Sequence, residues 1–184
     1  MQRLSKQTGV TLIELMISVS IVGVLSTTVA PSMQDILIKN SITAQMNELS
    51  SVVQYARSHA IDQQIDTVLC PSNDFATCSN NWQQGKIVFV DSNADGIRND
   101  NEELLVAKNA VSEPSIVTGP ANALRFLPNG ATNTPAKILF CSDADDSTQA
   151  RALLISLQGR VKTSTDNDNN GIDEDTDGTS LSCS

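Results

Sequence analysis

Histidine and aromatic residues are scarce in this 184-residue sequence. His59 is the single histidine, and aromatic residues make up 3% of the chain. A histidine-based catalytic triad would have to use His59, and the chain has neither a Gly-x-Ser-x-Gly nucleophile motif nor a Gly-x-x-x-x-Gly-Lys phosphate loop. These absences give catalysis no support, and we expect a protein that is not an enzyme.

Basic residues are also few. The chain has 12 Lys and Arg against 21 Asp and Glu, which gives a formal net charge of −9. A protein with this excess of negative charge is repelled by phosphate backbones. The composition therefore excludes a generic nucleic-acid binder.

A long apolar run occurs near the amino terminus. A short leader containing Arg3 and Lys6 ends at Gly9, and Glu14 is the only charge between Val10 and Ala30. As a helix this run would be about 31 Å long, which matches the hydrocarbon thickness of a bilayer. A secretory signal peptide has a shorter apolar region followed by a cleavage site, whereas this run continues into an amphipathic helix. The sequence predicts a membrane segment that stays in the mature protein if cleavage occurs before it.

Glu14 is the one acid within this predicted membrane segment. An ionised carboxylate inside hydrocarbon is costly, so such a residue is functional by default and has a partner. The alternative is that the segment is a signal anchor whose single acid extends to the lipid headgroups.

Four cysteines in a chain delivered across a membrane favour disulfides over metal ligands. Three connectivities are open. We favour a small loop closed by Cys70 and Cys78, which leaves Cys141 to pair with Cys183 and hold the carboxyl-terminal tail.

The remaining sequence predicts an α+β domain. Apolar residues at helical spacing continue the helix to about Gln64, with a kink or local melting expected at Pro31. After that the period becomes that of strands, and turn residues such as Pro128-Asn129-Gly130 favour antiparallel connections. The predicted strands are Thr67 to Cys70, Lys86 to Asp91, Glu103 to Lys108, Ser115 to Thr118, Ala123 to Leu127, Ala136 to Cys141, Ala152 to Leu157 and Arg160 to Thr163.

An acidic loop between two of these strands matches the twelve-residue calcium loop of EF-hands. Oxygen-bearing side chains stand at its first, third, fifth and twelfth places, a glycine is sixth, and the seventh residue would offer its carbonyl. The alternative is a solvated turn without metal, which the same residues also favour. The candidate ligands are Asp91, Asn93, Asp95, Ile97 and Glu102.

A second acidic loop near the carboxyl terminus repeats the pattern with aspartate at the last place. Aspartate is shorter than the usual glutamate and less suited to bidentate closure, which weakens the match. Six acids crowd this loop and would repel one another without a cation, the alternative being a flexible acidic tail. The candidate ligands are Asp166, Asp168, Asn170, Ile172 and Asp177.

The segment Gly-Val-Thr-Leu-Ile-Glu-Leu from Gly9 resembles the signal of type IV pilin-like proteins, with Val10 where the family usually has Phe. The resemblance implies that a prepilin peptidase cuts between Gly9 and Val10 and methylates the new amino terminus. Glu14 and Pro31 stand where the family places its acid and its proline, and the partner implied for Glu14 is the Val10 amine of a neighbouring subunit. The chain then divides into a leader (1–9), a transmembrane and assembly helix (10–31) and a globular domain (32–184).

Further motifs are spread across the domain, namely Ala56-Arg57-Ser58-His59-Ala60-Ile61, Leu69-Cys70, Trp82, Gly85, Ile87 to Asp91, Phe126, Gly130 and Ile155 to Arg160. In these motifs the chain resembles one branch of the pilins, the FimT, FimU and secretion-system H group of minor pilins and pseudopilins. That group's fold is a long amino-terminal helix packed on two antiparallel β-sheets. The resemblance implies a minor pilin of a type IV pilus involved in pilus assembly or initiation, held in the inner membrane by a single span with its domain in the periplasm. Its implied partners are other pilins or pseudopilins, the prepilin peptidase and the inner-membrane assembly platform. A type II secretion pseudopilin H is the alternative, and no cofactor other than calcium is expected.

Gly159-Arg160-Val161-Lys162 suggests a third function. FimT-like proteins that take up DNA during natural transformation carry a Gly-Arg-x-Arg element, and this chain has Lys162 at the last place. Lysine can still contact a phosphate as a point charge, without arginine's planar fork. DNA binding through Arg160 and Lys162 is therefore an alternative, opposed by the neighbouring acids.

Overall fold

The computed structural model describes residues 9–111, 115–142 and 147–183, except for the side chains of residues 28–32. The chain divides into two compact units, residues 1–37 and 38–184. The first contains the start of helix α1, Leu12–Gln63. The second contains the rest of that helix and all eight named strands, so the predicted α+β class is confirmed.

Helix α1 is continuous across Pro31. This corrects the expectation of local melting there. A proline removes one backbone hydrogen bond, and a helix of 52 residues retains bonds on both sides of that position.

The eight strands form two antiparallel sheets. The sheet order is β3-β2-β1-β5 in one and β4-β6-β7-β8 in the other. Each predicted strand has its counterpart, with ends that differ by a few residues because strand boundaries depend on pairing as well as on sequence. The strands are β1 Thr67–Ser72, β2 Gly85–Val90, β3 Leu104–Lys108, β4 Ile116–Thr118, β5 Leu124–Phe126, β6 Ala136–Cys141, β7 Arg151–Ile155 and β8 Val161–Thr163.

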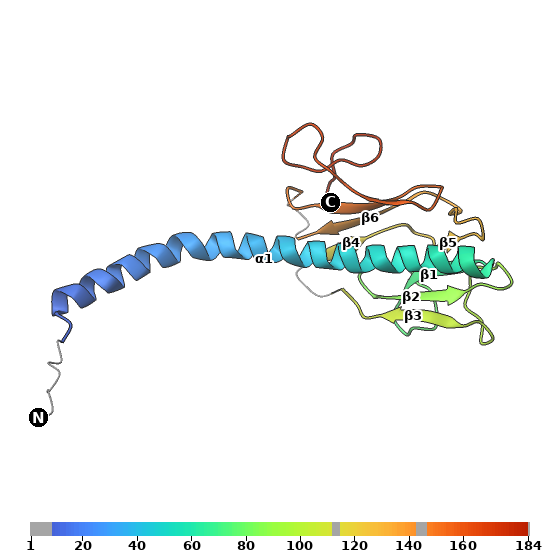
Figure 1. Ribbon diagram of the computed structural model, residues 1–184, viewed down its shortest axis with the longest axis horizontal. Helices are drawn as coiled ribbons and strands as arrows, with labels where there is room; N and C mark the ends of the chain where they lie inside the picture. Colours follow the sequence, from blue (N-terminus) through green and yellow to red (C-terminus); the bar gives the residue numbers. More distant parts are fainter. Residues whose placement is uncertain (1–8, 112–114, 143–146, 184) are drawn as a thin grey trace, which may run out of the picture. The chain divides into compact units, whose positions relative to one another are not determined.

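The main core lies between α1 and both sheets (Figure 1). Residues of α1 from Ile42 to Ala60 recur at helical spacing on the buried face, as the sequence predicts. Leu69 of β1, Phe126 of β5 and Leu153 of β7 meet them from the sheets, and all three are fully buried.

Each sheet also has a second buried face, and a disulfide lies at each. The Cys70–Cys78 bond joins β1 to the loop that follows it, beside a small cluster containing Val68 and Phe89. The Cys141–Cys183 bond joins β6 to the carboxyl-terminal tail. Both favoured pairings are confirmed. Because both faces of β1 are covered, its residues are buried without the alternation of a half-exposed strand.

Candidate functional site

In the amino-terminal unit, the apolar side chains that the structure describes form an exposed surface. The side chains of Val10, Leu12, Ile13 and Val24 are each more than half exposed, and their apolar neighbours on the same helix are similarly exposed. An uncovered apolar surface of this kind indicates an interaction with lipid or with another protein. No helix in the described part of the chain is both long and apolar enough to cross a membrane.

Glu14 lies in the first turn of α1, at the beginning of this apolar surface. Its backbone N–H donates to Thr11 Oγ1 at 3.3 Å, an N-terminal capping contact. The helix dipole favours a negative charge at this end. The Glu14 carboxylate makes no ion pair with a described residue, so it is free to pair with a group from another chain.

Gly9 and Val10 lie just before the helix and are exposed. An exposed, non-helical segment is the form in which a peptidase can bind a peptide bond. Residues 1–8 of the predicted leader lie outside the described residues.

The first acidic loop connects β2 to β3, as predicted for a loop within a hairpin. The carboxylate of Asp91 accepts hydrogen bonds from the backbone of Asp95 and Gly96, at 3.1 and 3.0 Å. Both oxygens of Glu102 accept backbone bonds, from Ser92 at 2.8 Å and Asn99 at 2.9 Å. The loop is thus closed by its own amides.

A basic residue from outside this first loop also contacts it. Arg125 donates to the carbonyl oxygen of Ala94 at 2.8 Å and pairs with Asp66 at 2.8 Å. Burial raises the pKa of Asp91, while the backbone N–H of Ile97 lowers the pKa of Asp95. Among the described residues, the predicted side-chain ligands of this first loop do not form a cluster of three carboxylates.

The second acidic loop has the same local conformation. The carboxylate of Asp166 accepts from the backbone of Asn170 and Gly171 at 3.2 and 2.9 Å, which repeats the Asp91 contacts four and five residues ahead. The fourth and sixth residues of each loop have positive φ, 63° and 75° at Ala94 and Gly96 and 61° and 90° at Asn169 and Gly171. The repeated sequence pattern therefore gives a repeated fold of the chain.

A cluster of carboxylates distinguishes the second loop from the first. Among the described residues, Asp166, Asp168 and Glu174 bring carboxylate oxygens within 4.8 Å of one another. Glu174 is the residue that sequence reasoning missed, because the twelve-residue template places the closing acid at Asp177, which is not in the cluster. Backbone bridges that pair Glu174 with Thr165 and with Ser180 place it there.

Arg160 lies just before β8 and Lys162 lies within it, and both are exposed. Neither forms an ion pair with a described residue. They are therefore accessible to an external anion.

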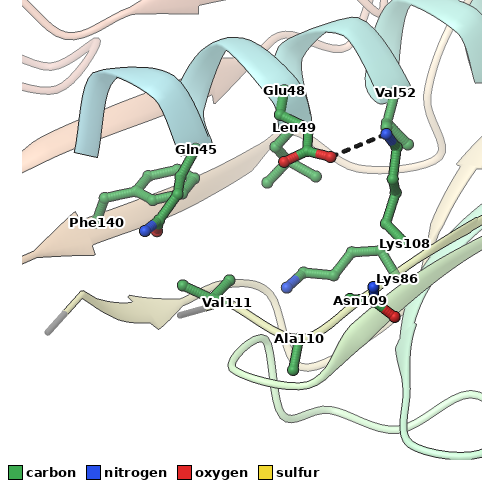
Figure 2. Close-up of a pocket in the computed structure, with 10 residues that line it drawn as sticks. All are labelled: Gln45, Glu48, Leu49, Val52, Lys86, Lys108, Asn109, Ala110, Val111 and Phe140. Carbon is green, nitrogen blue, oxygen red and sulfur yellow. Dashed lines mark ion pairs between the residues drawn. The ribbon is translucent and has the colours of Figure 1, made fainter. Parts of the chain in front are cut away.

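A cavity of about 110 Å³ lies between α1 and the sheet containing β2 and β3, with Phe140 of β6 on one side (Figure 2). Glu48 of α1 pairs with Lys108 of β3 at 2.9 Å across its edge. Lys86 of β2 is 4% exposed, and its Nζ donates to the carbonyl oxygens of Trp82 and Gln84, each at 2.7 Å. Burial lowers the pKa of Lys86 to about 8, although the nearby Glu48 acts in the opposite direction.

This lowered pKa predicts a pH dependence of stability. Between about pH 8 and the ordinary value of 10.5, the unfolded chain keeps the Lys86 proton while the folded chain releases it. The unfolded state then binds more protons, so the free energy of unfolding rises with pH in this window. We expect the rise from pH 7.5 to 9.5 to be smaller in Lys86→Met, measured by urea unfolding with the fluorescence of the single tryptophan, Trp82. Lys162→Met, at an exposed position, should keep the wild-type slope, and an unchanged slope in Lys86→Met would contradict the assignment.

Comparison with known proteins places these features in a family. The family model described as type II transport protein GspH matches residues 45–159, and the prokaryotic N-terminal methylation motif matches residues 4–30. A search of curated protein sequences found no match.

Solved structures share the fold. The type IV minor pilin FimU of Pseudomonas aeruginosa has a TM-score of 0.55 and 21% identity, over 68% of this chain and 90% of FimU. The minor pseudopilin EpsH from the type 2 secretion system of Vibrio cholerae has a TM-score of 0.50 and 11% identity, over 67% of this chain and 95% of EpsH. Because the GspH model covers more than half of its length and the methylation motif precedes it, the chain belongs to the GspH family of pilin-like proteins.

Proposed function

We propose that this protein is a minor pilin of a type IV pilus, a structural subunit involved in filament assembly or initiation and not an enzyme. The observation that carries the proposal is the N-terminal methylation motif on a helix whose described apolar side chains are exposed from Leu12 to Leu25 and from Met33 to Leu37. Such a surface can be covered first by lipid and then by the helices of other subunits.

In this mechanism residues 10–31 anchor the precursor in the inner membrane, with the domain in the periplasm. Prepilin peptidase cuts after Gly9 and methylates the Val10 amine. Glu14 then pairs with the amine of a neighbouring subunit, which neutralises two charges that are costly in hydrocarbon. Packing against other pilins, at the assembly platform, moves the helix from the membrane into the filament.

Recovery in sheared filaments tests the proposal. Cells that assemble type IV pili should release the subunit with the pilus fraction, and the same cells without the assembly platform should retain it in the membrane. Its absence from the pilus fraction would contradict this function. Recovery only from cells with an overproduced secretion pseudopilus would instead support the alternative, a type II secretion minor pseudopilin.

DNA binding for natural transformation is a second candidate, favoured by the exposure of Arg160 and Lys162 without ion-pair partners among the described residues. A phosphate backbone would contact both side chains, so binding should weaken as salt rises. We expect an Arg160→Ala, Lys162→Ala double variant to lose salt-sensitive DNA retention in a gel-shift assay, with Lys137→Ala as a control at another exposed lysine. Absence of retention by the wild type would reject this candidate.

A further inference from the structure

We propose that the carboxyl-terminal loop binds a calcium ion through Asp166, Asp168 and Glu174. The proposal goes beyond the role of a filament subunit, because it assigns a ligand to the domain itself.

The three carboxylates come from two parts of the loop and lie close together. Asp166 and Asp168 belong to the first turn of the loop, and Glu174 lies in the later segment that folds back beside Thr165. Oxygens from all three lie within 4.8 Å of one another. A metal ion of ordinary size can contact three oxygens spaced in this way, since calcium–oxygen distances are about 2.3–2.6 Å.

Glu174 gives the observation that is independent of the clustering. Glu174 is buried, with 4% of its surface exposed. Its Oε2 accepts a hydrogen bond from the backbone N–H of Asn167 at 2.7 Å. Its other oxygen, Oε1, is buried and has no hydrogen-bond partner. A buried carboxylate oxygen without a partner is unfavourable, and a bound cation would supply the missing partner.

The distribution of charge around the loop also favours a cation. Two other acids of the loop have basic partners, since Asp173 lies 3.4 Å from Arg151 and Asp175 lies 3.2 Å from Lys137. The three clustered carboxylates have no such partner among the described residues. Their mutual repulsion is therefore offset only by hydrogen-bond donors of the loop itself, such as the backbone N–H groups of Asn167 and Gly171, and by no basic side chain among the described residues.

The ligand chemistry favours calcium over other metals. All three ligands are hard oxygens, and all four cysteines are held in disulfides, so no thiolate is available. Asp168 is exposed, which leaves an open side for water ligands. Calcium accepts six to eight oxygens in flexible geometry, whereas magnesium requires a smaller, nearly octahedral site.

The ion would hold the tail in place. Glu174 is bridged on one side to Thr165, just after β8, and on the other to Ser180, three residues before Cys183. Binding at Glu174 therefore links β8 to the disulfide-bonded end of the chain. Binding only to the folded state would raise stability by mass action.

The full-length protein in detergent, treated with chelator and then dialysed, allows a direct test by calorimetric titration with calcium chloride. We expect one calcium ion per chain, at least about tenfold weaker binding in both Glu174→Gln and Asp168→Asn, and a change of less than about twofold in Asp177→Asn. Asp168 is exposed, so its variant keeps the test valid if Glu174→Gln fails to fold. At equal calcium concentration the melting temperature should rise in the wild type and rise less in Asp168→Asn.

Two results would overturn the proposal. The first is no binding of calcium up to about 10 mM, a concentration above the dissociation constants of about 10⁻⁴–10⁻³ M of extracellular calcium modules. The second is binding that is lost in Glu102→Gln and retained in both Glu174→Gln and Asp168→Asn, which would move the site to the loop after β2.

Discussion

A Glu14→Ala variant is expected to insert into the membrane and to be processed after Gly9, yet to be depleted at least about tenfold from the pilus fraction. Removing one partner of a buried ion pair costs about 3–5 kcal/mol, because the other charge is left uncompensated. In the proposed filament that other charge is the Val10 amine of a neighbour. The measurement is the ratio of subunit in sheared pili to subunit in the membrane, by quantitative immunoblot.

Two further variants separate charge from shape at this position. Glu14→Gln keeps the size of the side chain and removes the charge, so it should be depleted like Glu14→Ala. Glu14→Asp keeps the charge on a shorter side chain and should recover part of the incorporation. Wild-type incorporation of Glu14→Ala would show that the pairing is not needed.

A Gly159→Ala variant is expected to lower the free energy of unfolding of the domain by about 2–4 kcal/mol. Gly159 has a φ of +70°, where an L side chain is strained, and an added Cβ would meet the carbonyl oxygen of Gly130 and the guanidinium of Arg57. The same guanidinium donates from Nε to that carbonyl at 2.9 Å, which joins α1 to the turn at Gly130. The added methyl group would therefore separate the helix from two turns. Urea unfolding followed by Trp82 fluorescence measures the effect.

Gly178→Ala is the matched control for this prediction. Gly178 has a similar φ of +77°, and a Cβ there would meet nothing within 4 Å. Its cost should be limited to the backbone strain, about 1–2 kcal/mol. Equal destabilisation by the two variants would show that the close contact of Gly159 with Gly130 and Arg57 does not contribute to the free energy of unfolding.

Much of the fold could be predicted because the spacing of apolar residues changes once along the chain, from that of a helix to that of strands. Helical spacing up to about Gln64 and strand-like segments after Thr67 correspond closely to α1 and the eight named strands. The predicted turn residue Gly130 also lies in a turn, where its backbone N–H donates to the carbonyl oxygen of Leu127. These signals are local, so a single sequence contains them.

The composition of the acidic cluster depends on contacts that the sequence does not display. The calcium-loop template correctly places Asp166 and Asp168 in one turn, because the spacing of ligands within a turn is local. Glu174 joins them through backbone bridges to Thr165 and Ser180, which form only when the tail folds back. A template that counts residues along the chain therefore predicts Asp177 as the closing ligand, whereas in the structure Glu174 lies beside Asp166 and Asp168.

The mass of the mature subunit tests the central claim most directly. Intact-mass spectrometry of the protein recovered from sheared pili should give a chain that begins at Val10 with one added methyl group and contains two disulfides. That mass would establish both processing at the methylation motif and residence in a filament. A chain that retains residues 1–9, or one cleaved after the apolar run, would contradict the account, because the helix bearing Glu14 would then be blocked or lost.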